Sequence, residues 1–189
     1  MSIKNITLAA LTATALSTTL PAIADKGAYF GAQYAITEYE QSGTNGVTAN
    51  DGDAKPTAFV ITAGYSFSKH IALEGRWGFG MSDDEIFAAT ATTSAIDVDI
   101  NHIVSVLGKF SLGGPISPYV VVGFSDAELD ATGNQTASVD GVSAGLGIDF
   151  SITEKAAISL EYIDYADADV VGGGTSELTA TSLGFNYKF

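Results

Sequence analysis

Large apolar side chains alternate with small or polar ones along most of the chain. Between Ile71 and Met81, one set is Ile71, Leu73, Gly75, Trp77, Phe79 and Met81, and the other is Ala72, Glu74, Arg76, Gly78 and Gly80. A period of two is typical of a β-strand, because successive side chains of a strand point to opposite faces. After the first 24 residues, no segment has apolar residues at positions i, i+3, i+4 and i+7, the spacing of an amphipathic helix. The sequence therefore predicts an all-β protein.

Eight segments follow this pattern, and residues that favour turns separate them. The predicted strands are 28–39, 57–67, 71–82, 96–112, 118–127, 138–150, 156–166 and 178–189. Their connections alternate in length. Short turns at 68–70, 113–117 and 151–155 alternate with longer connections at 40–56, 83–95, 128–137 and 167–177. Neighbouring strands that run up and down would place all the long connections at one end, as in bacterial membrane barrels.

The polarity of the two strand faces separates a membrane barrel from a soluble sandwich. In a sandwich the apolar faces meet in a core, and the outer faces are polar. Here the second face is mostly Gly, Ala and Ser. Small side chains suit the crowded lumen of a narrow barrel, whereas bulky apolar ones suit lipid. We therefore expect an eight-stranded antiparallel up-and-down transmembrane β-barrel.

The first 24 residues have the features of a signal peptide for export. Lys4 supplies the positive end, a weakly apolar run follows from Ile6 to Leu20, and Ala22-Ile23-Ala24 forms a small-residue cleavage pattern. The apolar run is shorter than the roughly 20 residues that a membrane-spanning helix needs. We expect cleavage after Ala24, which leaves 25–189 as the barrel domain.

Charge and cysteine content exclude several classes of function. The chain has 22 acidic and 8 basic residues, which gives a formal net charge of −14 at pH 7. That sign disfavours binding to nucleic acid phosphates. The absence of cysteine excludes disulfides and thiol nucleophiles. Most of the acids lie in the long connections and the adjoining strand ends, so that end of the barrel should be strongly anionic.

The C-terminus resembles that of a known group of proteins. Phe185, Tyr187 and Phe189 occupy the fifth-last, third-last and last positions. Further similarity lies in Tyr29–Tyr34, Pro118–Gly123 and Ile158–Tyr162. The chain resembles the small eight-stranded outer-membrane barrels grouped with the OmpA membrane domain and OmpX.

The resemblance implies location in the outer membrane, in contact with its lipid and lipopolysaccharide. It also implies that Phe185, Tyr187 and Phe189 form a signal that the barrel-assembly machinery recognises. The connections could hold an extracellular partner, and we expect no cofactor. A fold of this kind hosts several roles, so the resemblance does not define a biochemical activity.

Four charged residues are expected to meet inside the barrel. The alternation that turns Ile71 and Leu73 outward turns Glu74 and Arg76 inward. The same alternation in the seventh predicted strand turns Glu161 inward. In the fourth predicted strand the outward set is Val98, Ile100, Val104, Val106, Phe110 and Leu112, so Lys109 faces inward. We interpret Glu74, Arg76, Lys109 and Glu161 as a lumen charge cluster. The alternative is that each charge is separately solvated at a strand end.

Catalytic and metal motifs are weak. His102 is expected on the lipid-facing side of its strand and Ser105 on the opposite side. A nucleophile and its base must share a side, so this pair does not suit catalysis. Asp97, Asp99 and Asn101 imitate the start of a calcium loop, but the glycine and glutamate that such a loop requires are missing. We expect no metal and no enzyme activity.

Two functions fit these features. The first is a non-enzymatic structural or surface-interaction barrel, with acidic extracellular loops and a lumen plugged by side chains. The second is a narrow porin-like channel for small or apolar solutes, because glycines on the lumen face could leave a path for water.

Overall fold

Ten β-strands and no helix make up the described part of the chain. The computed structural model describes residues 26–43, 52–82, 84–86, 96–131, 135–170 and 174–189. Side chains are described for 26–39, 55–82, 99–129, 138–165 and 177–189. The proposed signal peptide lies outside these ranges. No described helix is long and apolar enough to cross a membrane.

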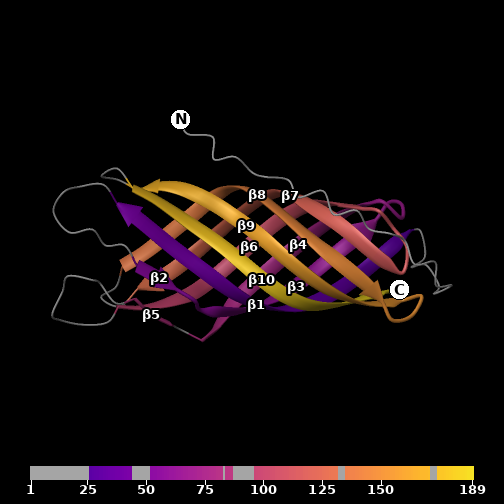
Figure 1. The fold of residues 1–189 in the computed structure, drawn as a ribbon, viewed down its shortest axis with the longest axis horizontal. Helices are drawn as coiled ribbons and strands as arrows, with labels where there is room; N and C mark the ends of the chain where they lie inside the picture. Colours follow the sequence, from indigo (N-terminus) through magenta and orange to yellow (C-terminus); the bar gives the residue numbers. More distant parts are fainter. Residues whose placement is uncertain (1–25, 44–51, 83, 87–95, 132–134, 171–173) are drawn as a thin grey trace.

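Eight of the strands are long and form a closed antiparallel barrel (Figure 1). They are β1 (Gly27–Gly43), β3 (Thr57–Ser66), β4 (Ile71–Ser82), β6 (Ile96–Ser111), β7 (Ile116–Ala131), β8 (Gln135–Ser151), β9 (Ala156–Val170) and β10 (Gly174–Lys188). Each pairs with the next along the chain, and β10 closes the ring on β1. Two short strands, β2 (Gly52–Ala54) and β5 (Asp84–Ile86), pair with β1 and β6. The predicted fold class is confirmed.

Tight turns join the strands at one end of the barrel, which we call the turn end. The Ser68 hydroxyl accepts the backbone N–H groups of His70 and Ile71 at 3.2 and 3.1 Å. The Thr153 hydroxyl accepts those of Lys155 and Ala156 at 3.2 and 3.0 Å. These side chains satisfy donors that the strand ladder cannot reach. The opposite end, which carries the other connections, is the loop end.

At the loop end the strands run further than the sequence indicates. The connections predicted at 128–137 and 167–177 are mostly strand, because Ala131 pairs with Gln135 and Val170 pairs with Gly174. The prediction of four long connections was therefore wrong at these two places. Strands of 15 to 17 residues in β8, β9 and β10 exceed the roughly 9–11 residues that cross a bilayer. The extra length continues the hydrogen-bonded ladder beyond the apolar surface.

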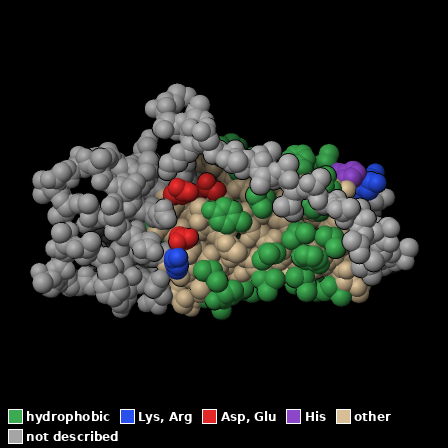
Figure 2. Space-filling view, viewed as in Figure 1, with side chains coloured by type: hydrophobic (Ala, Val, Ile, Leu, Met, Phe, Trp, Pro, Cys, Tyr) green, Lys and Arg blue, Asp and Glu red, His purple; other side chains and the backbone are tan. Residues whose placement is uncertain are grey.

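Many large apolar side chains are exposed on the outside of the barrel, and Figure 2 shows groups of them on one face. On β4, Leu73, Trp77 and Phe79 are 48%, 60% and 42% exposed, whereas Glu74 and Arg76 between them are buried. Burying this apolar surface in lipid rather than water gains roughly 25 cal/mol for each Å². The exterior therefore suits a hydrocarbon environment, as predicted from the bulky apolar side chains on one face of each strand.

A β-bulge in β6 changes which residues face the lumen. The pairing of β6 with β7 shifts between Ile100 and His102. Ile100 and Ile103 are both buried, with 2% and 1% exposure. The prediction that Ile100 faces lipid was wrong, because one extra residue in a strand reverses the parity beyond it.

Candidate functional site

The lumen contains a network of charged side chains centred on Arg76. Its side chain is 1% exposed and extends from β4 to β9, which lies four places away in the ring of eight strands. Arg76 Nη1 and Nη2 lie 2.5 and 2.9 Å from Glu161 Oε1 and Oε2. Arg76 Nε and Nη2 lie 2.9 and 2.5 Å from Glu74 Oε2. One planar cation therefore joins carboxylates from opposite walls, and its fork geometry favours this arrangement.

Two tyrosines complete the hydrogen bonding of the glutamates. Tyr29 donates its hydroxyl proton to Glu74 Oε1 at 2.6 Å, and Tyr119 donates to Glu161 Oε2 at 2.9 Å. A buried carboxylate is costly unless its oxygens are satisfied in this way. The network therefore satisfies both carboxylates within the protein.

Each tyrosine crosses a glycine to reach its glutamate. Tyr29 pairs across the ladder with Gly64, and Gly64 pairs with Glu74 on the next strand. Tyr119, Gly147 and Glu161 repeat this relationship on β7, β8 and β9. A Cβ at Gly64 would lie 2.6 Å from Tyr29 Oη. A side chain at this position would therefore displace the ring.

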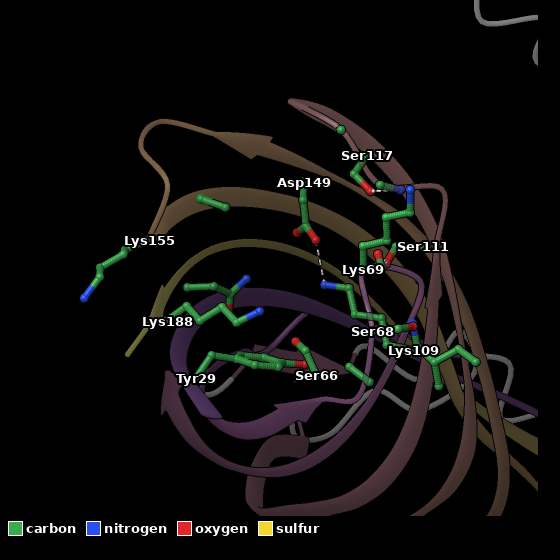
Figure 3. Close-up of a pocket in the computed structure, with 16 residues that line it drawn as sticks. Tyr29, Ser66, Ser68, Lys69, Lys109, Ser111, Ser117, Asp149, Lys155 and Lys188 are labelled. Carbon is green, nitrogen blue, oxygen red and sulfur yellow. Dashed lines mark hydrogen bonds and ion pairs between the residues drawn. The ribbon is translucent and has the colours of Figure 1, made fainter. Parts of the chain in front are cut away.

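Lys109 and Asp149 extend the network toward the turn end. Lys109 Nζ lies 2.8 Å from Asp149 Oδ2 and 3.7 Å from Glu74 Oε1. It also lies 3.8 Å from the centroid of the Tyr119 ring, which is a favourable cation–π position. Figure 3 shows the bond from Lys109 to Asp149 inside the ring of strands.

The structure thus brings Glu74, Arg76, Lys109 and Glu161 into one buried group. Sequence reasoning did not include Asp149, Tyr29 or Tyr119. The parity of β8 could have identified Asp149, which follows the small residues of the lumen face. Parity alone could not reveal the two tyrosines as members, because their hydroxyls reach glutamates two strands away.

Apolar side chains fill the lumen on the loop side of this network. Toward the loop end, the next inward-facing residue after Glu161 on β9 is Ile163, and the next one after Lys109 on β6 is Leu107. Both are fully buried. They belong to an apolar cluster that also contains Val60, Ile103, Val121, Leu129, Val139 and Leu178. The lumen face is therefore less uniformly small than the sequence suggests.

A row of hydroxyls crosses three strands beside these apolar residues. Hydrogen bonds of 2.6 Å join Ser105 to Ser125 and Ser125 to Ser143. The Ser143 hydroxyl also lies within hydrogen-bond distance of the Tyr165 carbonyl. The row gives buried polar atoms partners in a part of the lumen that is otherwise mostly apolar.

The C-terminal aromatic residues lie on the outer surface at the turn end. Phe185, Tyr187 and Phe189 are 47%, 41% and 69% exposed. The ring of Phe189 packs edge-on against Tyr187 and Phe30, with centroids 5.5 and 6.1 Å apart. The backbone N–H of Phe189 donates to the Ala28 carbonyl at 3.2 Å. These contacts connect the last residue to the first strand.

The histidines lie apart from the lumen network. His102 Nε2 is 3.3 Å from Asp126 Oδ1 on the outer surface, whereas Ser105 faces the lumen. At the turn end, His70 Nδ1 lies 2.9 Å from the carbonyl of Ser111. Within the described residues, no group of three acidic or histidine side chains could hold a metal ion.

A closed barrel with a large apolar surface on its outside and a buried charged network in its lumen defines a transmembrane β-barrel protein. Residues 6–189 match the family model of the outer membrane protein beta-barrel domain. The chain belongs to this family and is an outer-membrane protein. No curated protein sequence matches it significantly.

Solved structures share the fold. Neisserial surface protein A is 14% identical, with a TM-score of 0.61 over 88% of this chain and 99% of the other. OprG from Pseudomonas aeruginosa is 14% identical, with a TM-score of 0.63 over 88% and 98%. Ail of Yersinia pestis, in complex with the heparin analogue sucrose octasulfate, is 16% identical, with a TM-score of 0.55 over 88% and 100%. At these identities the likeness extends to the fold alone.

Proposed function

We propose that the protein is a closed, non-enzymatic barrel that anchors an acidic surface in the outer membrane. The bridge from Arg76 to Glu74 and Glu161 carries this proposal, because it joins opposite walls of the lumen at hydrogen-bond distance. All three side chains are at most 2% exposed. An ion that follows the lumen would have to displace a paired, buried charge, which is costly.

The apolar cluster blocks the same path a second time. Leu107, Ile163 and Leu178 each have an exposure of 0%. Apolar side chains offer a hydrated ion no partner to replace its water. The two obstacles lie in series along the barrel, so opening one of them leaves the lumen closed.

The loop end is proposed to face the cell exterior, because outer-membrane barrels have short turns in the periplasm. Described acidic side chains near this end are Glu38, Asp99, Asp126, Glu128, Asp140, Asp164 and Glu177. Lys55, which lies 2.9 Å from Glu38, is the lysine described among them. A surface of this sign attracts cationic partners and repels polyanions. The proposed role is therefore presentation of an anionic surface.

Conductance of the refolded protein in a planar bilayer tests the closed lumen. We expect no steady current from the parent protein. The variant Arg76→Ser/Glu161→Ser should also remain silent, because the apolar cluster still blocks the path. A large porin in the same bilayer shows that channels can be detected. Steady conductance by the parent would instead favour the narrow channel for small solutes.

A further inference from the structure

Strands β8 and β9 separate at the loop end of the barrel. The pairing between them ends there at Ala144 and Asp164. Beyond that pair, β8 stays with β7 and β9 stays with β10, each to the end of its strand. Within the described backbone, no pair joins 135–143 of β8 to 165–170 of β9. We call the space between these two stretches the β8–β9 seam.

A bulge in β9 fixes where the seam begins. The pairing of β9 with β10 passes from Asp164 to Ala166 and skips Tyr165. The Tyr165 carbonyl lies within hydrogen-bond distance of the Ser143 hydroxyl on β8. An extra residue bends its strand and increases its twist. A side chain therefore takes the place of the next ladder hydrogen bond, and the separation of β8 from β9 is part of the fold.

The seam begins where the apolar outer surface ends. Val142 on β8 and Phe124 on β7 form a pair across the two strands and are 63% and 70% exposed. Toward the loop end, the next outward residues are Asp140 and Asp126, which also pair with each other. Backbone groups without a partner are costly in hydrocarbon, but in water they bond to the solvent. The seam therefore faces water beyond the apolar surface.

Within the described strands, the seam leaves one side of β8 as a free sheet edge. In an antiparallel ladder, successive residues direct their N–H and C=O groups alternately to the two sides of the strand. Every second residue of 135–143 therefore offers a donor and an acceptor to the seam. Natural edge strands are often protected by lysine or proline, and this stretch contains neither. The edge is therefore suited to pairing with a further strand.

The charge around the seam is negative. Asp140 is exposed beside the free edge, and Asp126 lies next to it on β7. The sequence of the β9 stretch adds Asp167 and Asp169, and neither stretch contains lysine or arginine. A second copy of this edge would bring its own aspartates to the seam, and repulsion between like charges disfavours that pairing. A strand that carries lysine or arginine is favoured instead.

We infer that the β8–β9 seam binds an extended cationic segment of another protein, which adds to β8 as a further strand. Backbone hydrogen bonds to β8 supply affinity, and lysine or arginine near Asp140 supplies selectivity. This inference rests on the proposed anionic surface and names its partner. It does not depend on the lumen being closed to ions.

A short peptide of alternating lysine and valine, capped at both ends, tests this pairing. The full barrel is refolded in a non-ionic detergent at low ionic strength, and binding is followed by the fluorescence anisotropy of the labelled peptide. We expect saturable binding. The same peptide with every backbone nitrogen methylated keeps its charge but cannot donate hydrogen bonds to β8. It should therefore bind roughly tenfold more weakly.

Two variants of equal charge separate the seam from the general field of the loop end. Asp140→Asn should weaken binding roughly threefold, because it removes the exposed carboxylate beside the edge. Glu38→Gln removes an exposed carboxylate on β1, which lies three strands from β8, and should leave the dissociation constant nearly unchanged. Heat-modifiable mobility in electrophoresis verifies folding. Equal weakening by the two variants, or equal binding of the two peptides, would overturn the inference and leave the anionic surface in place.

Amide hydrogen exchange measured by NMR tests the free edge directly. Without peptide, every second amide between Ser138 and Val142 should exchange fast, and the lysine peptide should slow this exchange. Protection of all these amides in the free protein would mean that the seam is already occupied. Protection that persists on dilution would assign the occupant to this chain, and protection that is lost would assign it to a second copy. Either result, or no binding of the lysine peptide, would overturn the inference.

Discussion

Tyr29 and Tyr119 occupy equivalent positions in two halves of the barrel. Each lies opposite a glycine on the neighbouring strand and donates its hydroxyl proton to a glutamate on the strand beyond. The first set lies on β1, β3 and β4, and the second on β7, β8 and β9. The lumen network is therefore built from a repeated unit, and Arg76 joins the two copies.

Arg76→Ala should destabilise the barrel strongly, because it removes the bidentate cation of the buried Glu161 and leaves the buried Glu74 with the more distant Lys109. Removal of one partner from a buried pair costs about 3–5 kcal/mol. Lys55→Ala removes an exposed ion pair with Glu38, which is worth less than about 1 kcal/mol. Urea unfolding in detergent micelles should show the difference. Equal midpoints for the two variants would contradict the network as a stabilising element.

Gly147→Ala should destabilise the barrel by roughly 1–3 kcal/mol, as expected for overpacking. The new Cβ would lie 2.5 Å from Tyr119 Oη and 2.8 Å from the Leu160 carbonyl. Gly75→Ala is the matched control, because its nearest atom, the Ala63 carbonyl oxygen, is 3.9 Å away. The same urea experiment compares them. A Gly75→Ala loss as large as that of Gly147→Ala would show that strand glycines matter here for reasons other than the tyrosines.

Deletion of Phe189 should sharply reduce the amount of assembled barrel and leave export intact. The residue contacts Tyr187 and Phe30 at the seam between β10 and β1, and the resemblance assigns it to the assembly signal. Phe67→Ala is the control, since Phe67 is another exposed aromatic residue near the turn end. The heat-modifiable band in membrane fractions measures assembly. Similar yields from both variants would remove Phe189 from that role.

Cells that display the protein should not gain adhesion to heparin-coated beads. The acidic side chains near the loop end, such as Asp126 and Asp140, repel a sulfated polymer. Intact cells expose the outer surface alone, so the assay tests the loop end of the barrel. Beads coated with a cationic polymer provide the comparison. Binding to heparin that exceeds binding of cells without the protein would reject the proposed repulsive surface.

Export should remove residues 1–24. The sequence around Ala24 fits a cleavage site, and the barrel begins shortly after it, at Gly27. Intact-mass measurement of protein extracted from outer membranes should place the N-terminus at Asp25. Any other N-terminus would move the predicted cleavage site.

Parity predicts the strands well, because a period of two is a local property of the chain. It places Glu74, Arg76, Lys109 and Glu161 on the inner face. The bulge at Ile100 to His102 escapes this reasoning, since nothing in the local pattern marks the extra residue. The alternation also does not predict which charged side chains pair with one another. Arg76 and Glu161 are 85 residues apart, and their contact depends on ring closure and strand stagger.

The turns also contain a feature that the sequence does not predict. Phe67-Ser68 and Phe150-Ser151 look equivalent in sequence, but the hydroxyl equivalent to that of Ser68 belongs to Thr153. Strand β8 continues through Ser151, so the second turn is displaced along the chain. Only the hydrogen bonds reveal which residue starts each turn.

Arg76 is the only arginine in the chain, and it serves a glutamate in each half of the barrel. A partly assembled sheet that lacks β9 would leave this guanidinium with Glu74 alone, and β9 without β4 would carry Glu161 into the bilayer with no cation. The closed ring of strands is therefore what brings Arg76 and Glu161 together and pairs the charges of the lumen. An incomplete barrel in the bilayer therefore has unpaired charges that raise its free energy, and the finished barrel does not.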